Sequence, residues 1–283
     1  MGKPFLVFIF RIIPKAFLSR IFGMLTRLPV GQSALSPLLR VYCDKYRVDL
    51  DEIDTPEEGF RTFDQFFTRR LKRGVHTINP DPKAVVSPVD AHVSQFGEIT
   101  GTRIMQAKNI DYLVSDLVPA SIHHTFLDGT FVTLYLSPAD YHRIHSPVDG
   151  VVNGLLHVPG KLFPVMEFAV NGIQGLFSVN ERLISYIKTD AGVCAVCKIG
   201  AMNVGRISVS YSDVVTNRSM FRRKREIIFP ADFRPHMRKG DELGTFHLGS
   251  TVVLLFQKGM VRLDALHEGQ RVRVGEKIAT IVQ

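Results

Sequence analysis

A serine and two histidines lie in motifs whose residue types could support nucleophilic chemistry. Ser250 follows Gly249 in a Gly-Ser-Thr step between two apolar runs, and His142 and His145 share one loop bounded by prolines. Asp90 lies in an earlier Pro-Val-Asp turn. A serine hydroxyl becomes a nucleophile when a base removes its proton, and a carboxylate can orient that base. We therefore expect Ser250 to act as a nucleophile, with one histidine as its base and Asp90 as the orienting group.

The acyl group nearest to Ser250 is the carbonyl of Gly249. Because glycine has no Cβ, the hydroxyl can approach the peptide that precedes it. Attack would convert the amide to an ester, so the sequence predicts self-cleavage between Gly249 and Ser250. The alternative is a serine hydrolase that acts on lipids and keeps Ser250 intact. That alternative lacks the G-x-S-x-G nucleophile elbow.

A metal site is the main rival explanation for the histidine loop. Zinc needs a third and a fourth ligand, and the pair His123 and His124 lies in an ordinary polar stretch. Cys194 and Cys197 form a lone C-x-x-C within an apolar, strand-like run, so we interpret them as structural. The sequence predicts no metal.

The N-terminal residues combine apolar and basic side chains. The net charge of the chain is +8, which favours an anionic partner. Residues 5–13 and 16–25 are rich in Phe and Ile, with Lys and Arg between them. Neither run reaches the roughly 18 apolar residues that a spanning helix needs. We expect two helices lying on an anionic membrane surface, with helices that cap the core as the alternative. Nucleic acid fits poorly, because the basic residues are embedded among apolar ones.

The rest of the chain predicts an α+β protein. Helical patterns cover residues 34–50 and 62–71, with Thr62 as an N-cap. Near residue 75 the texture changes to short β-branched runs separated by turn residues. The strongest predicted strands cover residues 129–136, 205–211 and 250–256. We expect a helical membrane-associating region over residues 1–75 and a β-rich, barrel-like catalytic domain over residues 76–283. A non-enzymatic, carrier-like binding module is a further alternative, but it leaves the histidine loop unexplained.

Several motifs, in this order along most of the chain, resemble those of the phosphatidylserine decarboxylase family. They are Ser87-Pro88-Val89-Asp90-Ala91, Phe131 to Pro138, Asp140-Tyr141-His142-Arg143-Ile144-His145 and Leu248-Gly249-Ser250-Thr251. The resemblance implies a proenzyme cut into a β chain of residues 1–249 and an α chain of residues 250–283, which stay associated. The two chains could also form a higher oligomer.

The resemblance also implies the cofactor and the reaction. β-Elimination at Ser250 would leave a pyruvoyl group, which forms a Schiff base with phosphatidylserine and releases carbon dioxide to give phosphatidylethanolamine. We assign His145 as the base for cleavage, with Asp90 on its other ring nitrogen. His142 is assigned to decarboxylation, as a proton donor or as an orienting contact to the carboxylate. Phe163, Pro164 and Val165 are assigned to the acyl side of the pocket, with core packing as the alternative. A two-chain lipid stays in its bilayer, so we expect a peripheral enzyme on the cytoplasmic side of the cell membrane.

Overall fold

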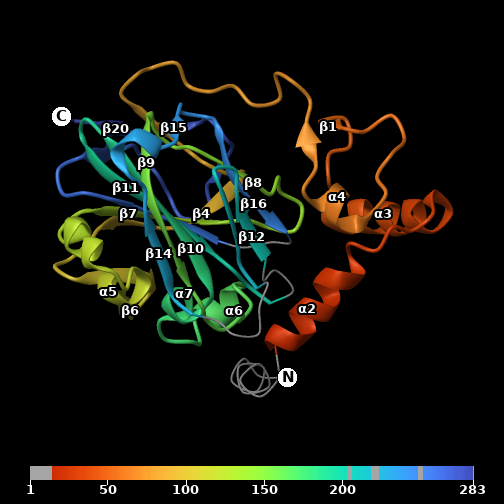
Figure 1. Cartoon of the computed structure of the whole chain (residues 1–283), viewed down its shortest axis with the longest axis horizontal. Coiled ribbons are helices and arrows are strands. Elements are labelled where there is room, and N and C mark those ends of the chain that lie inside the picture. Colours follow the sequence, from red (N-terminus) through yellow and green to blue (C-terminus); the bar gives the residue numbers. More distant parts are fainter. Residues whose placement is uncertain (1–14, 203–205, 218–222, 248–250, 283) are drawn as a thin grey trace.

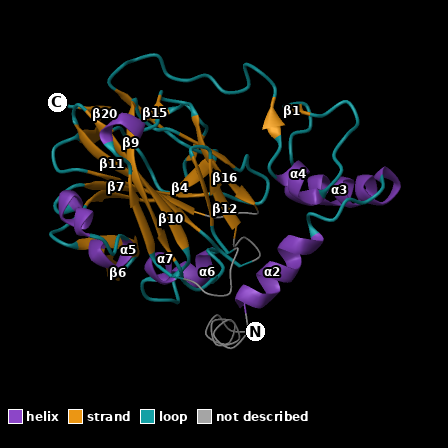
Figure 2. Cartoon of the chain, viewed as in Figure 1, coloured by secondary structure: helices purple, strands orange, loops and turns teal. Residues whose placement is uncertain are grey.

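The protein has the predicted α+β class, with helices at the start of the chain and sheets after them (Figures 1 and 2). A computed structural model describes residues 15–202, 206–217, 223–247 and 251–282. The predicted helix over residues 5–13 and the cleavage pair Gly249 and Ser250 lie outside the described residues. The helices and 3-10 turns are α2 (Lys15–Leu25), α3 (Gln32–Tyr46), α4 (Phe63–Phe67), α5 (Val114–Leu117), η1 (Ser121–Phe126), α6 (Glu167–Val170), α7 (Leu176–Val179) and η2 (Ala231–Phe233).

A nine-stranded antiparallel sheet forms the centre of the molecule. Its strands, from one edge to the other, are β14 (Arg225–Ile228), β9 (Gly150–Val158), β10 (Arg182–Thr189), β11 (Gly192–Ile199), β17 (Thr251–Phe256), β7 (Thr130–Tyr135), β4 (Ala91–Glu98) and β19 (Arg271–Val272), while β15 (His236–Met237) also pairs with β9. β17 lies between β11 and β7, and every one of its residues is buried. A continuous apolar run such as Thr251 to Phe256 suits a strand with both faces covered.

A four-stranded sheet packs against one face of the central sheet. Its order is β13 (Ser212–Val215), β12 (Arg206–Val209), β16 (Glu242–His247) and β8 (Arg143–His145). Three smaller sheets complete the β structure: β18 (Val261–Leu263), β20 (Lys277–Ile281) and β3 (Ala84–Val86); β5 (Arg103–Ala107) and β6 (Ile110–Leu113); and β1 (Ile53–Asp54) and β2 (Arg70–Leu71). Within the described residues the sheets are open and do not close into the barrel that we expected.

Alternate residues of β17 belong to two separate core clusters, because successive side chains of a strand point to opposite faces. Val252 packs in the cluster that includes Phe246 of the four-stranded sheet. Val253 packs in the cluster that includes Phe177 of α7. The central sheet therefore has strands on one face and short helices on the other.

The helical region has a small core of its own, formed by Leu35, Cys43, Ile53, Phe60 and Phe66. The predicted N-cap of α4 is confirmed, since the Thr62 side chain accepts a hydrogen bond from the backbone of Gln65.

Two helices of this region are shorter than predicted. α3 ends at Tyr46 because Arg47 adopts the left-handed conformation, with φ 56°. α4 ends at Phe67 because Arg70 and Leu71 pair with β1. Among the described residues, no helix combines the length and the apolar character needed to cross a bilayer.

Candidate active site

The loop that carries both histidines leaves the central sheet and enters the four-stranded sheet. It follows β7 and runs into β8, and the Asp140 carboxylate folds it by accepting a hydrogen bond from Ser137 N at 2.7 Å. The link that contains Ser250 joins β16 to β17 and so connects the same two sheets. β7 pairs with β17, and β8 pairs with β16. The two connections therefore cross between the sheets beside the same strands.

Contacts at the ends of these strands bring the histidine loop near the residues on either side of the link that contains Ser250. Tyr135, the last residue of β7, is opposite Thr251, the first residue of β17. On the β16 side of the link, the backbone N–H of Phe246 donates to the carbonyl of His142 at 2.9 Å. Both residues that flank the undescribed link, His247 and Thr251, therefore lie near the histidine loop.

His142 is fully buried and has a defined tautomer. Its Nδ1 lies 2.7 Å from the carbonyl oxygen of Asp140. A carbonyl only accepts, so Nδ1 carries the proton and Nε2 holds a lone pair. Nε2 has no hydrogen-bond partner among the described residues, and the ring lies against Phe67 with centroids 4.0 Å apart. Burial, reinforced by the positive charge of Arg69, lowers the pKa of His142 to about 3.

His145 has the same tautomer in a less enclosed position. Its Nδ1 donates to the carbonyl of Gly240 at 2.7 Å, and its Nε2 lies 3.2 Å from the hydroxyl of Tyr141. Burial lowers the pKa of His145, while the Gly240 carbonyl and the carboxylates of Glu242 and Asp90 oppose that shift. At neutral pH the ring is therefore neutral, with Nε2 available as a base once Tyr141 releases it.

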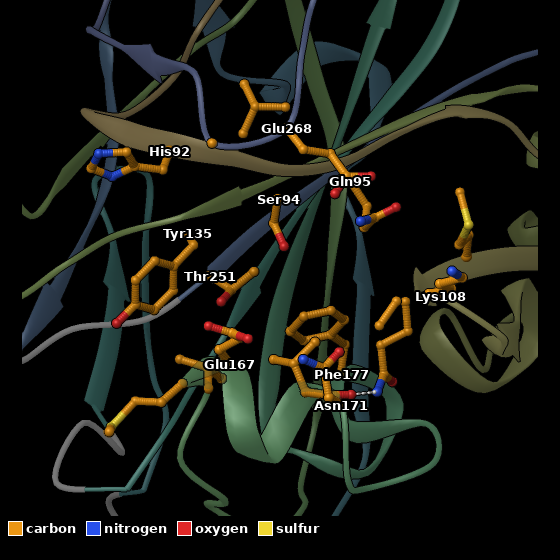
Figure 3. Close-up of a pocket in the computed structure, with 18 residues that line it drawn as sticks. His92, Ser94, Gln95, Lys108, Tyr135, Glu167, Asn171, Phe177, Thr251 and Glu268 are labelled. Atoms are coloured by element: carbon orange, nitrogen blue, oxygen red, sulfur yellow. Dashed lines mark hydrogen bonds between the residues drawn. The ribbon is translucent and has the colours of Figure 1, made fainter.

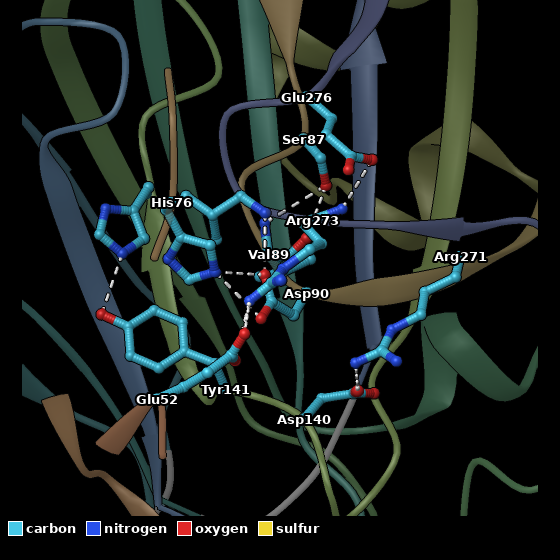
Figure 4. A network of polar contacts seen from close by, with 12 residues as sticks. Glu52, His76, Ser87, Val89, Asp90, Asp140, Tyr141, Arg271, Arg273 and Glu276 are labelled. Atoms are coloured by element: carbon cyan, nitrogen blue, oxygen red, sulfur yellow. Dashed lines mark hydrogen bonds and ion pairs between the residues drawn. The ribbon is translucent and has the colours of Figure 1, made fainter. Parts of the chain in front are cut away.

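The expected hydrogen bond between Asp90 and His145 is not among the contacts of the described residues. The carboxylate of Asp90 instead lies 2.8 Å from Nε2 of His76 and accepts from Val274 N at 2.8 Å (Figure 4). The ring of Tyr141 lies between the two histidines, 5.2 Å from His76 and 5.7 Å from His145. Among the described residues, Asp90 therefore acts on His145 through its charge and not through a hydrogen bond.

Sequence reasoning did not identify His76. It is a single histidine in a polar stretch, and no spacing links it to Asp90. Only the folded chain brings the two side chains together.

A cavity of about 830 Å³ opens beside the start of β17 (Figure 3). Thr251 and Tyr135 form part of its wall. Its charged lining residues are Lys108, Glu167 and Glu268, none of which the sequence had indicated. Apolar lining residues include Val165, Met166, Val170 and Phe177.

Phe163 does not line this cavity. Its side chain is buried in the core cluster on the helical face of the central sheet. Val165, which was assigned together with Phe163, lies in the cavity wall.

The described residues contain no group of three or more His, Cys, Asp or Glu that could hold a metal ion. Cys194 and Cys197 are three residues apart on β11, an odd spacing that places their side chains on opposite faces of the sheet. They pack in different core clusters, and burial raises the pKa of both thiols. Two thiols on opposite faces of one strand cannot share a ligand.

Comparison with known proteins identifies the family. Residues 63–280 match the model of the phosphatidylserine decarboxylase family. The chain is 42% identical over 273 residues to the phosphatidylserine decarboxylase proenzyme of Myxococcus xanthus, with 96% of each chain covered. It is 38% identical over 284 residues to the proenzyme of that name from Brevibacillus brevis, with 99% of each covered. The order of motifs and this similarity along nearly the whole length lead to one conclusion: the chain belongs to the phosphatidylserine decarboxylase family.

Proposed function

We propose that this chain is a proenzyme that cuts its own Gly249–Ser250 bond and then decarboxylates phosphatidylserine to phosphatidylethanolamine. One observation carries the proposal: the histidine loop and the link that contains Ser250 cross between the same two sheets beside the same strands. A base and a nucleophile that are remote in the sequence thus belong to neighbouring connections. The proposed substrate and the proposed precursor state rest on the names of the similar proteins, which are phosphatidylserine decarboxylase proenzymes.

The proposed cleavage begins with attack by the Ser250 hydroxyl on the carbonyl carbon of Gly249. His145 Nε2 takes the hydroxyl proton and passes it to the departing backbone nitrogen of Ser250. The C–N bond breaks as the C–O bond forms, which gives an ester. The tautomer of His145 supports this role, because its Nδ1 proton is engaged by Gly240 and only Nε2 has a lone pair.

Elimination then separates the two chains. A base removes the Cα proton of Ser250, the Cα–H electrons form the Cα=Cβ double bond, and the Cβ–Oγ bond breaks to release Gly249 as a carboxylate. Hydrolysis of the resulting dehydroalanine releases ammonia and leaves a pyruvoyl group at residue 250. The α chain would stay bound because β17, its first strand, is buried between β11 and β7.

The residues beside position 250 fit a pyruvoyl group and an amino-acid headgroup. The group supplies a carbonyl that condenses with an amine and accepts the electrons left when carbon dioxide departs. Thr251 lies in the wall of the 830 Å³ cavity, so a group bonded to it would face a space large enough for the headgroup. Lys108 can attract the phosphate or carboxylate of the substrate, and Glu167 its ammonium.

We assign His142 to the turnover reaction. Its Nδ1 proton is bonded to Asp140, so the resting ring accepts a hydrogen bond at Nε2 and does not donate one there. Because burial lowers its pKa to about 3, the ring does not take the ammonium proton. Its Nε2 can accept a hydrogen bond that orients the substrate, or relay a proton to the carbon from which carbon dioxide has left.

The backbone register, however, brings His142 closer than His145 to the end of β16 that leads to Ser250. That observation favours the reverse division of labour between the histidines. Separate measurement of cleavage and turnover in variants of each residue distinguishes the two assignments.

We also propose a peripheral association with an anionic membrane surface, on the cytoplasmic side of the cell membrane. The helical region supports the association with a surface. Large apolar side chains of α2 and α3 face solvent, among them Phe17 and Val41, which are 61% and 66% exposed. Exposed apolar groups beside basic residues suit the boundary between headgroups and acyl chains. The proposed substrate stays in the bilayer, so the active site must approach it there.

The experiment is the intact mass of the purified protein under denaturing conditions. The proposal expects two chains divided at Gly249–Ser250, the smaller with a pyruvoyl terminus, and a single uncut chain for Ser250→Ala. A folded wild-type protein that stays as one chain with an unmodified serine would refute self-cleavage and favour the lipid hydrolase.

A further inference from the structure

The segment of residues 62–70, here called the α4 segment, contacts the candidate active site at several points. It contains α4 and lies in the region that the sequence assigns to membrane association. Phe67 covers the ring of His142, and the Thr68 carbonyl accepts from Nε of Arg143 at 3.0 Å. Two charged residues of the segment, Asp64 and Arg69, make the contacts that bear on function.

Arg69 binds the backbone of the histidine loop. Its side chain is only 4% exposed, and its Nη2 donates to the carbonyls of Ala139 at 2.8 Å and Asp140 at 3.4 Å. The Asp140 carbonyl is the same one that accepts from Nδ1 of His142. Arg69 and His142 therefore meet at one oxygen atom, and the position of the guanidinium fixes the acceptor that defines the tautomer of His142.

The burial of Arg69 is costly. Its Nε and Nη1 have no hydrogen-bond partner among the described residues, and a buried, unsatisfied donor destabilises a fold. The ring of Phe66 lies 5.2 Å from the guanidinium carbon and compensates in part. A buried charge that the fold retains despite this cost is a candidate for a functional constraint.

Asp64 holds the strand that leads to the cleavage bond. Its carboxylate oxygens lie 3.0 and 3.2 Å from Nδ1 of His247, the last residue of β16. The other ring nitrogen of His247 lies 3.2 Å from the hydroxyl of Ser208 on β12. The ring of His247 is thus fixed from both sides immediately before the link that contains Gly249 and Ser250.

We propose that the α4 segment is a positioning element of the active site, in which Asp64 acts through His247 on the cleavage bond and Arg69 acts through the Asp140 carbonyl on His142. This inference rests on the proposed function. It assigns the two residues to different steps: Asp64 to self-cleavage and Arg69 to turnover. The helical region then contributes to chemistry as well as to membrane association.

The first experiment follows self-cleavage over time after synthesis of the precursor in a cell-free system. Asp64→Asn keeps the size of the side chain but removes the charge, and it should slow cleavage about tenfold, as expected when one charge-assisted contact to a reacting segment is lost. Asp44→Asn, the same change at an exposed site on α3, should cleave at the wild-type rate. A wild-type rate for Asp64→Asn would overturn this part of the inference.

A double-mutant cycle separates positioning from a general loss of stability. If Asp64 acts through His247, then Asp64→Asn combined with His247→Gln should cleave no more slowly than the slower single variant. Additive slowing in the double variant would mean that Asp64 acts by another route. If the wild-type precursor itself stays uncut, the proposed function fails, which is a different outcome from either of these.

The second experiment measures turnover of the cleaved enzyme with phosphatidylserine in mixed micelles. Arg69→Met should lower kcat about tenfold or more with little change in KM, because the change misplaces His142 and removes no contact with substrate. Arg69→Lys keeps the charge and should recover part of the loss, and it also serves if the Met variant fails to fold. Arg73→Met removes an exposed arginine just beyond the segment and is the matched control. Wild-type kcat in a folded, cleaved Arg69→Met enzyme would overturn this part.

Discussion

Lys198 provides a quantitative test of the structure. It lies on β11 opposite Val252 of β17, and its side chain is fully buried. Its Nζ lies 2.6 Å from the hydroxyl of Ser185 and 3.2 Å from the carbonyl of Val196, and within the described part of the chain it forms no ion pair with a carboxylate. Burial lowers the pKa of Lys198 from 10.5 to about 7, while the neighbouring thiols oppose the shift. The prediction concerns how this lysine couples folding to pH.

The sign of the pH dependence follows from the protonation of Lys198 in the folded and the unfolded protein. Between pH values of about 7 and 10.5 the unfolded chain keeps the lysine proton, and the folded protein releases it. The free energy of unfolding therefore rises with pH across this window. Below about pH 7 both states hold the proton, and the buried charge then destabilises the folded state most. With these two pKa values, the free energy of unfolding should increase by about 2 kcal/mol from about pH 7 to pH 9 because of this residue alone. Lys198→Met has no such group and should lack this increase.

The assay is urea unfolding followed by circular dichroism at several pH values. The uncut Ser250→Ala background keeps a single chain and so favours a two-state transition. The measured quantity is the difference in unfolding free energy between this parent and its Lys198→Met variant as a function of pH. Lys188→Met, at an exposed position on β10, is the matched control and should keep the pH dependence of its parent. Parallel curves for the Lys198→Met variant and its parent would show that the lysine stays charged when buried, and would refute the reasoning.

Two further predictions concern the histidines and the membrane. His145→Ala should stay uncut, whereas His142→Ala should be cut but turn over poorly, as measured by gel electrophoresis and by release of carbon dioxide; the opposite pattern would reverse the two roles. The pKa of His142 is lowered to about 3, so the pH profile of turnover by the cleaved enzyme should show no ionisation of this residue between about pH 5 and pH 9. An ionisation in that range that disappears in His142→Ala would contradict the burial of the ring. Deletion of residues 1–28, which removes α2 and its exposed apolar residues, should weaken binding to vesicles of anionic lipid in a sedimentation assay. Equal binding by the truncated and full-length proteins would leave these helices without a membrane role.

The local elements of this protein could be predicted from its residues alone. The N-cap at Thr62 and the central strand Thr251–Phe256 were both predictable, because capping and the burial of a continuous apolar run depend on neighbouring residues. The class of the fold and the family also followed from the order of elements and motifs. The expected barrel did not, since closure depends on which strands pair at the sheet edges, and no local pattern encodes that pairing.

The set of side chains that meet at the site depends on the packing of the folded chain. The sequence identified Asp90 but not its contact with His76, because that ring reaches the carboxylate only through the fold. Arg69 gave no signal, since one arginine in a basic stretch resembles any other until burial distinguishes it from its exposed neighbour Arg70. Contacts such as that between Asp64 and His247 join residues separated by 183 positions. A short-range code of propensity and periodicity can place each residue on its own element, but the distances between elements are set by the packing of the whole chain.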